Sequence, residues 1–303
     1  MPKLLITGAS GFVGRAAVAT LAGGGYEILA AVRRPPEPAF AAGVEVVRHP
    51  DLSEVFDWRP LLDGVNQVIH LAGVAHTGRG VAPEVFDRVN RQATAELAAA
   101  AAKAGVGHFV FVSSIRAQSG PAADHALTER DAAAPTDAYG RSKLAAEAAV
   151  RSAGIPFTIL RPVLLYGPGV KGNFALLLRA ARSRWPLPVN RFYNRRSLLG
   201  IDNFISALRF VLSEPAKGET YLVADPGIPM RLPDIMTTLR EARGRRPLLV
   251  TLDPDYLEIA LRLLRRHDLW ERLGGNLRVD PSKLLAAGWQ PAHDTRTGLA
   301  ALV

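Results

Sequence analysis

Short apolar runs alternate with amphipathic segments through the first half of the chain. The runs predict strands, and the segments in which apolar residues recur every three or four positions predict helices. Strands are expected at 3–7, 27–32, 44–48, 67–71, 108–113 and 156–160, and helices at 12–22, 84–104 and 140–153. This alternation is typical of an α/β fold with a doubly wound parallel sheet.

The second half of the chain lacks the regular alternation of strands and helices. A loop at 166–169 precedes predicted helices at 173–184, 202–213, 232–242 and 255–266 and a strand at 219–223. We therefore expect a main domain over residues 1–165 and a smaller C-terminal α/β lobe over 166–303. Later segments, such as 198–213, are expected to return to the main domain.

The helix predicted at 255–266 combines apolar residues with arginines. The favoured interpretation is a helix of the lobe whose arginine face is solvated. A helix that lies on a membrane surface or binds a partner is the alternative.

Three glycines follow the first predicted strand. Gly8, Gly11 and Gly14 stand between that strand and the first helix. Glycine permits backbone angles closed to other residues and lets the main chain approach a pyrophosphate closely. The helix N-terminus behind them offers N–H groups and a positive dipole to phosphates. The context predicts a dinucleotide-binding domain of the Rossmann type over residues 1–165.

Composition and charge narrow the class of protein. The 303 residues are 48% hydrophobic, which permits a large core, and include no cysteine, which excludes disulfides and cysteine-bound metals. We expect no metal site. The apolar stretch after Lys3 ends at Thr7, too short for a secretion signal, and no run reaches the ~18 apolar residues of a membrane span. A cytoplasmic protein is expected.

The net charge of +9 suits a nucleic acid, a polyanionic small substrate or scattered surface charge. No basic run interleaves with aromatic residues. A small anionic substrate is therefore preferred to a nucleic-acid partner.

Tyr139 and Lys143 carry the strongest catalytic signal. They are four residues apart, which places both on one face of a helix. A phenol with a pKa near about 10 is a poor acid or base at neutral pH, and a nearby ammonium lowers that pKa. The pair can then exchange a proton with an alcohol oxygen while a hydride moves at carbon. Ser113 and Ser114 end a strand at the edge where ligands lie in this architecture, so a serine hydroxyl can hold a substrate oxygen near Tyr139.

Together these residues resemble the extended short-chain dehydrogenase/reductase family of nucleotide-sugar epimerases, dehydratases and reductases. The resemblance covers nearly the whole chain. It is carried by Thr7–Gly14, Asp51–Leu52, His70–Gly73, Asn90, Ser113–Ser114, Tyr139 with Lys143, and Arg161–Pro168. Residues 279–283 and 288–291 resemble the closing segment of the family, so the chain is expected to be complete.

The resemblance implies roles for the matching residues. Ser114, Tyr139 and Lys143 would be catalytic, with Tyr139 as the acid/base. Asp51 and Leu52 would contact the adenine, and Leu71–Gly73 would line the cofactor. The cofactor-binding set is Gly8, Ser10, Gly11, Phe12, Val13, Asp51, Leu52, Leu71, Ala72, Gly73, Asn90, Ser113, Tyr139 and Lys143. Asn173 and Arg196 would bind the diphosphate of a sugar nucleotide or its attached sugar, and Ser114 would contact the substrate.

The end of the second predicted strand bears on the cofactor. An acid that binds the ribose 2′-hydroxyl of NAD(H) is expected there. Val32 stands in its place, and Arg33 and Arg34 follow. An arginine attracts a 2′-phosphate, so these two residues join the cofactor-binding set and NADP(H) is favoured over NAD(H).

The sequence argues against one reaction of the family and leaves two others open. Residues 115–118 lack the Asp-Glu pair of the family's 4,6-dehydratases, so dehydration is not expected. A 4-epimerase and a 4-ketoreductase use the same catalytic residues and both stay open. The substrate would be a nucleotide-linked hexose, such as a UDP-N-acetylhexosamine or its 4-keto-6-deoxy derivative, in bacterial surface-polysaccharide synthesis. The alternatives are a catalytically silent NADP-binding protein and a reductase of non-sugar carbonyl compounds. A homodimer is possible.

Overall fold

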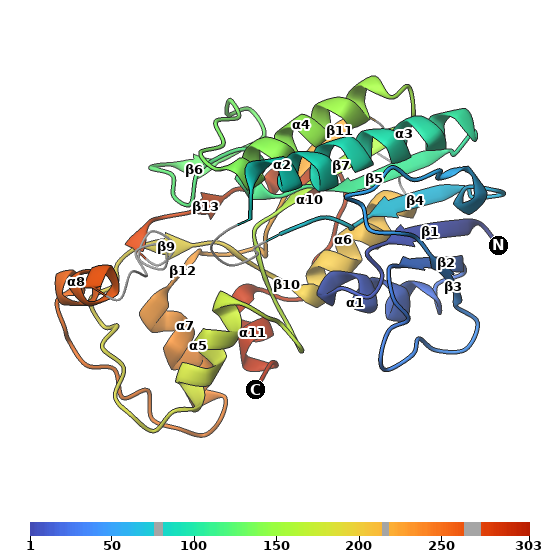
Figure 1. The fold of residues 1–303 in the computed structure, drawn as a ribbon. Helices are drawn as coiled ribbons and strands as arrows, with labels where there is room; N and C mark the ends of the chain where they lie inside the picture. Colours follow the sequence, from blue (N-terminus) through green and yellow to red (C-terminus); the bar gives the residue numbers. More distant parts are fainter. Residues whose placement is uncertain (76–80, 214–217, 264–273) are drawn as a thin grey trace.

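Seven parallel strands form the central sheet of a computed structural model that describes residues 1–75, 81–213, 218–263 and 274–303 (Figure 1). The strand order is β11-β7-β5-β4-β1-β2-β3, and all six pairings are parallel. The strands are β1 (Lys3–Thr7), β2 (Glu27–Val32), β3 (Glu45–Arg48), β4 (Gln67–His70), β5 (His108–Val112), β7 (Phe157–Pro162) and β11 (Glu219–Val223). The doubly wound sheet expected from the sequence is confirmed.

Helices cover both faces of the sheet (Figure 1). On one face, α1 (Phe12–Leu21) packs against α6 (Ile201–Ser213). On the other, α3 (Ala93–Lys103) packs against α4 (Ala138–Ser152). Each pair closes its own apolar core against the strands.

The predicted helix 84–104 is not one regular helix. It consists of α2 (Pro83–Phe86), a π-helical turn (Asp87–Gln92) and α3. A π turn adds a residue to the helical repeat and is frequent at functional sites. The apolar periodicity of the sequence continues through this turn, which is why a single helix was expected.

Segments beyond residue 165 complete the main domain. β11 pairs with β7 at the edge of the sheet, and α6 packs on α1. The helix α10 (Ser282–Ala286) contacts β11. The division of the chain at residue 165 stays a prediction.

A separate apolar core lies among the remaining elements and is formed largely by α5 (Asn173–Arg182), α7 (Leu232–Glu241) and α11 (Thr295–Ala300). None of the described residues of the helix α8 (Pro254–Leu263) belongs to this core. Three short two-stranded sheets pair β8 (Leu164–Tyr166) with β10 (Leu198–Gly200), β9 (Arg195–Arg196) with β12 (Met230–Arg231), and β6 (Ala126–Leu127) with β13 (Arg278–Val279).

The buried carboxylate of Asp225 connects this lobe to the main domain. It accepts hydrogen bonds from the Tyr166 hydroxyl at 2.8 Å, the Asn203 side chain at 2.7 Å and the backbone N–H of Gly200 at 2.9 Å. These groups belong to β8, α6 and β10. One carboxylate thus fixes the junction of three elements.

Candidate active site

The glycine turn between β1 and α1 forms a tight backbone cradle. Gly8 has a φ of 68°, and a Cβ on it would lie 2.8 Å from the backbone N of Ala72. A Cβ on Gly14 would lie 2.2 Å from the carbonyl oxygen of Gly8. Only glycine fits at both positions. Gly11 is the N-cap residue of α1, so the first N–H groups of this helix face the cradle without a capping side chain. The cradle fits the pyrophosphate of a dinucleotide.

The other predicted residues of this turn lie at the surface or just below it. Ser10 is exposed, whereas Phe12 and Val13 are half-buried at the start of α1. Leu71 is half-buried, Ala72 is buried and Gly73 is exposed where the chain leaves β4. The structure therefore brings β1, α1 and the end of β4 together around the cradle.

Arg33 and Asp51 form an ion pair beyond the end of β2. The Arg33 guanidinium donates to Asp51 Oδ2 at 2.8 Å, and its side chain is 66% exposed. Asp51 also accepts from the backbone N–H of Ser53 at 3.0 Å. These hydrogen bonds lower the pKa of Asp51. Arg34 is exposed, and Leu52 is buried in the core of the main domain.

Asn90 lies in the π turn and holds the segment that follows β4. Its side chain accepts from the backbone N–H of Val74 at 2.8 Å and donates to the Val74 carbonyl at 3.0 Å. It also donates to Ser142 Oγ on α4 at 3.0 Å. A Cβ on Gly73 would lie 2.8 Å from Asn90 Oδ1. Asn90 therefore supports the predicted cofactor-lining segment from behind.

Ser114 and Tyr139 meet at the carboxyl edge of the sheet. Ser114 follows β5, and its hydroxyl accepts from the backbone N–H of Arg116 at 3.2 Å. Tyr139 lies in the first turn of α4, and its hydroxyl is hydrogen-bonded to the Ser114 side chain. The ring of Phe86 packs edge-on against the Tyr139 ring at 6.1 Å between centroids. The two hydroxyls predicted to handle one substrate oxygen are thus in contact.

Lys143 lies one turn further along α4. Its ammonium donates to the carbonyl oxygen of Val112 at 2.9 Å and lies 4.7 Å from the centroid of the Phe111 ring. A Cβ on Gly73 would lie 3.6 Å from Lys143 Nζ, so the ammonium adjoins the segment after β4. Burial lowers the pKa of Lys143 to about 8, against the charge of Glu147, which raises it.

The expected lowering of the Tyr139 pKa is not found. Burial is the main cause of a raised pKa of this phenol, and the negative charge of Asp137 adds to it. The hydrogen bond from Ser114 and the charge of Arg116 lower the pKa, but by less than burial and Asp137 raise it. The Lys143 ammonium is directed at the Val112 carbonyl instead. The phenol is thus held protonated, as an acid.

Ser113 belongs to a buried polar network next to the candidate catalytic residues. Its hydroxyl donates to Glu147 Oε1 at 2.6 Å. Arg161 binds both oxygens of the same carboxylate, at 2.9 and 2.6 Å, and donates to the Gln118 side chain at 2.8 Å. Glu147 has no exposed side-chain surface, and Arg161 is 7% exposed. Sequence reasoning missed Glu147, although the spacing Tyr139, Lys143, Glu147 continues the same i, i+4 series.

Arg116 and Asp137 were also missed. Asp137 caps α4 by accepting from the backbone N–H of Gly140 at 2.7 Å, and it binds the Arg116 guanidinium at 2.6 Å. Both affect the pKa of Tyr139. Arg116 lies in the segment 115–118, in which the resemblance would place the acid pair of a dehydratase. No sequence signal joined the two residues, because they are 21 positions apart.

The predicted diphosphate ligands lie in the lobe. The Arg196 guanidinium donates to the carbonyl oxygens of Gly275 at 2.9 Å and Pro121 at 3.1 Å. Pro121 precedes β6 of the main domain, so Arg196 links the lobe to that domain. Asn173 begins α5, and its side chain lies outside the part of the chain that the structure describes.

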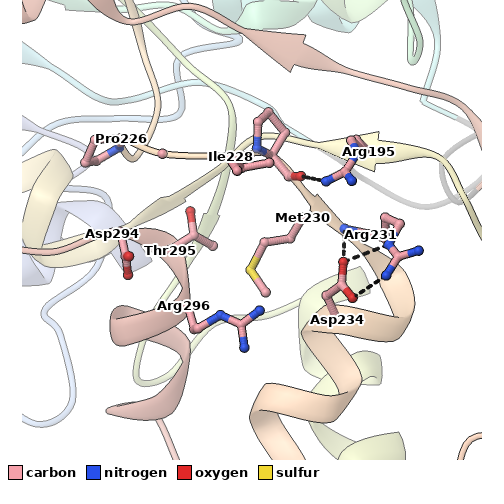
Figure 2. Close-up of a pocket in the computed structure, with 11 residues that line it drawn as sticks. Arg195, Pro226, Ile228, Met230, Arg231, Asp234, Asp294, Thr295 and Arg296 are labelled. Atoms are coloured by element: carbon pink, nitrogen blue, oxygen red, sulfur yellow. Dashed lines mark hydrogen bonds and ion pairs between the residues drawn. The ribbon is translucent and has the colours of Figure 1, made fainter.

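A pocket of about 550 Å³ opens elsewhere on the lobe (Figure 2). Two of its three arginines form hydrogen bonds within the lobe. Arg195 donates to the Pro229 carbonyl at 3.0 Å. Arg231 donates to both carboxylate oxygens of Asp234, each at 2.9 Å. Arg296 extends toward Met230 in Figure 2. The eleven lining residues include none of the predicted site residues. This pocket is therefore separate from the groups around Tyr139.

The described residues offer neither a metal-binding cluster nor a membrane-spanning helix. They contain no cluster of three or more histidine and acidic side chains arranged to hold a metal ion. None of the helices in these residues is long and apolar enough to cross a membrane.

Comparison with known families decides the class of the protein. The model of the NAD dependent epimerase/dehydratase family matches residues 4–224. The chain belongs to this family. The match spans the glycine cradle, Ser114, Tyr139 and Lys143, which are the groups that the sequence singled out.

Individual relatives show a range of activities. The chain is 31% identical to a UDP-glucose 4-epimerase of Vibrio cholerae, over 98% of this chain and 94% of that one. It is 32% identical to a ceramide reductase of Caulobacter vibrioides, over 95% of this chain and 85% of that one. Among solved structures, a UDP-glucuronic acid 4-epimerase from Bacillus cereus in complex with NAD superposes with a TM-score of 0.77 at 20% identity, over 99% and 94% of the two chains. This last likeness establishes the fold alone.

Proposed function

We propose that this protein moves a hydride at C4 of a nucleotide-linked hexose, with Tyr139 as the acid/base and Ser114 and Lys143 as its catalytic partners. The hydrogen-bonded pair Ser114–Tyr139 beside the glycine cradle carries the proposal. Family membership and the 31% identity to a UDP-glucose 4-epimerase support it.

The residues of the cradle fit a dinucleotide. The N–H groups at the start of α1 would bind its pyrophosphate, and Leu71–Gly73 would line its length. Lys143, whose Nζ adjoins Gly73, would bind the nicotinamide ribose. When bound, the nicotinamide supplies or accepts the hydride.

The proton is handled by this chain's own side chains. In the reducing direction, Ser114 donates a hydrogen bond to the C4 carbonyl oxygen and Tyr139 gives that oxygen its proton. In the oxidising direction the C4 hydroxyl gives its proton to the Tyr139 phenolate. The raised pKa of Tyr139 favours the protonated form that the reducing direction needs first.

The diphosphate of the substrate would bind at Arg196 and Asn173. The guanidinium fork of an arginine donates twice to phosphate oxygens. Arg196 now gives its donors to two backbone carbonyls, so substrate binding would exchange at least one of these bonds. A UDP-N-acetylhexosamine or its 4-keto-6-deoxy derivative is the proposed substrate, and the cytoplasm the proposed compartment.

The nucleotide that the protein retains distinguishes an epimerase from a reductase. An epimerase returns the hydride to the same sugar, so the purified protein should release NAD on denaturation and should interconvert UDP-N-acetylglucosamine and its C4 epimer without added cofactor. A 4-ketoreductase should be isolated without nucleotide and should consume NADPH with a 4-keto-6-deoxy substrate. If the protein binds cofactor and turns over neither substrate, the proposal fails and a catalytically silent NADP-binding protein remains.

A reductase of non-sugar carbonyl compounds is the second candidate. The 32% identity to a ceramide reductase, over 95% of the chain, favours it. NADPH consumption with a long-chain ketone and none with any sugar nucleotide would establish this alternative.

The cofactor preference depends on the exposed arginines after β2. We expect NADPH to bind more tightly than NADH and Arg33→Asp to reverse the order. The guanidinium of Arg33 attracts a 2′-phosphate, whereas a carboxylate there repels the phosphate and accepts a hydrogen bond from a 2′-hydroxyl. The measurement is a fluorescence titration with both cofactors.

Lys103→Asp is the matched control for Arg33→Asp. Lys103 ends α3 and is exposed. It lies a few residues before the amino end of β5, whereas Arg33 follows the carboxyl end of β2. This variant should keep the wild-type ratio of affinities. Equal affinities of the wild type for the two cofactors would remove the case for NADP(H).

A further inference from the structure

Exposed apolar side chains concentrate on one edge of the lobe. Of the fifteen large apolar side chains that are exposed in the described residues, eight lie in the segments 185–193 and 248–263. They are Trp185, Tyr193, Leu248, Val250, Leu252, Tyr256, Ile259 and Leu263. We call segments 182–193 and 243–263 together the basic apolar edge.

The two segments of this edge are side by side. Leu187 forms a parallel bridge with Leu249, and the Arg191 guanidinium binds Asp253 at 3.2 Å. In Figure 1 both segments run from the ends of α5 and α7 toward α8, at the end of the lobe away from the central sheet. The exposed side chains thus belong to one continuous region.

Arg240 holds the backbone of the two segments in place. This buried side chain of α7 donates to five backbone carbonyls, which belong to residues on both segments or next to them. The shortest of these bonds reach Pro247 at 2.5 Å and Trp185 at 2.8 Å. The apolar side chains are therefore displayed on a framework that is already formed.

The charges of the edge indicate what covers it. Its two segments carry seven arginines and three acidic residues. Arg184 and Arg246 are exposed, and the segment 182–193 has no acidic residue at all. On α8, Tyr256, Ile259 and Leu263 follow the i, i+3, i+7 spacing of one helix face, and all three are exposed. Arg262 beside them is 63% exposed.

We propose that the basic apolar edge docks on the surface of a bilayer that contains anionic lipids. Such a surface combines negative headgroups, which attract the arginines, with an apolar layer that accepts the face of α8. Trp185, Tyr193 and Tyr256 suit the boundary because their rings have an apolar body and a polar tip. Binding is peripheral and does not depend on the proposed reaction.

Flotation with lipid vesicles tests this proposal. The full-length protein should bind vesicles of phosphatidylcholine with about one-third phosphatidylglycerol, and bind pure phosphatidylcholine vesicles far more weakly. Two double variants, Ile259→Ser with Leu263→Ser and Arg184→Glu with Arg246→Glu, should each lower the partition coefficient about tenfold or more. The control variants on the main domain are Val55→Ser, which alters an exposed aliphatic residue, and Arg130→Glu, which alters an exposed arginine. Both should stay within about twofold of the wild type.

Three results would overturn the proposal. The first is failure of the wild type to bind the anionic vesicles. The second is equal binding by the edge variants and the controls, with all variants folded as judged by thermal melting. The third is a concentration-dependent dimer that Ile259→Ser with Leu263→Ser dissociates while vesicle binding is unchanged, because the edge would then join two copies of the chain.

Discussion

Replacing Tyr139 by phenylalanine is expected to lower turnover by about 10²- to 10⁴-fold while the protein still folds and binds its cofactor. The variant removes one oxygen, the group proposed to exchange a proton with the substrate. The ring stays, so its edge contact with Phe86 is kept. Ser114 can still donate a hydrogen bond to the substrate oxygen, but it cannot replace the proton that Tyr139 provides.

Steady-state turnover and cofactor binding should be measured in the same preparations. Tyr26→Phe is the matched control, since Tyr26 is a half-buried tyrosine of the main domain outside the candidate site. It should retain wild-type turnover. Activity of Tyr139→Phe near that of the wild type would contradict the mechanism, and so would a loss of cofactor binding that accounts for the whole effect.

The proximity of the candidate catalytic residues was predictable because it follows from local spacing. Tyr139 and Lys143 are one helical turn apart, and Ser114 follows a strand whose end faces the same edge of a parallel sheet. The glycine cradle is local in the same way. The sequence indicates that Gly8 and Gly14 lie in a tight turn, and in the structure a Cβ on either residue would clash with the backbone. Each of these features needs only a few consecutive residues and the direction of one strand.

The electrostatics of the site could not be predicted from that spacing. The sequence places an ammonium near a phenol and thus suggests a lowered pKa of Tyr139. The structure shields the half-buried phenol from water and sets Asp137 near it, and both effects raise the pKa. How much water surrounds a side chain depends on elements from several parts of the chain. A single helix does not contain that information.

The π turn that positions Asn90 was missed for a related reason. Apolar periodicity averages over many residues, whereas one extra residue in a turn shifts only the side chains near it. At this turn the shift lets Asn90 bind both polar groups of Val74 and reach Ser142 on α4. The sequence places a helix here, but its local geometry depends on the contacts with α4 and the segment after β4.

The largest expected loss of stability follows from a substitution in the buried polar network around Glu147. Arg161→Met should lower the free energy of unfolding by about 3–5 kcal/mol, because it leaves the buried carboxylate of Glu147 without its bidentate partner. Ser113 would still donate one hydrogen bond, and Arg151 lies 3.3 Å away but is 40% exposed. Neither offsets the charge as Arg161 does. The measurement is chemical denaturation followed by fluorescence.

Two further variants show that the effect comes from an unpaired buried charge. Arg151→Gln removes the exposed partner of the same carboxylate and should cost less than about 1 kcal/mol. Glu147→Gln combined with Arg161→Met removes both charges, and it should recover part of the loss because no ion remains uncompensated. A double variant no more stable than Arg161→Met alone would mean that Arg161 stabilises the fold through its packing and its bond to Gln118 rather than through the charge of Glu147.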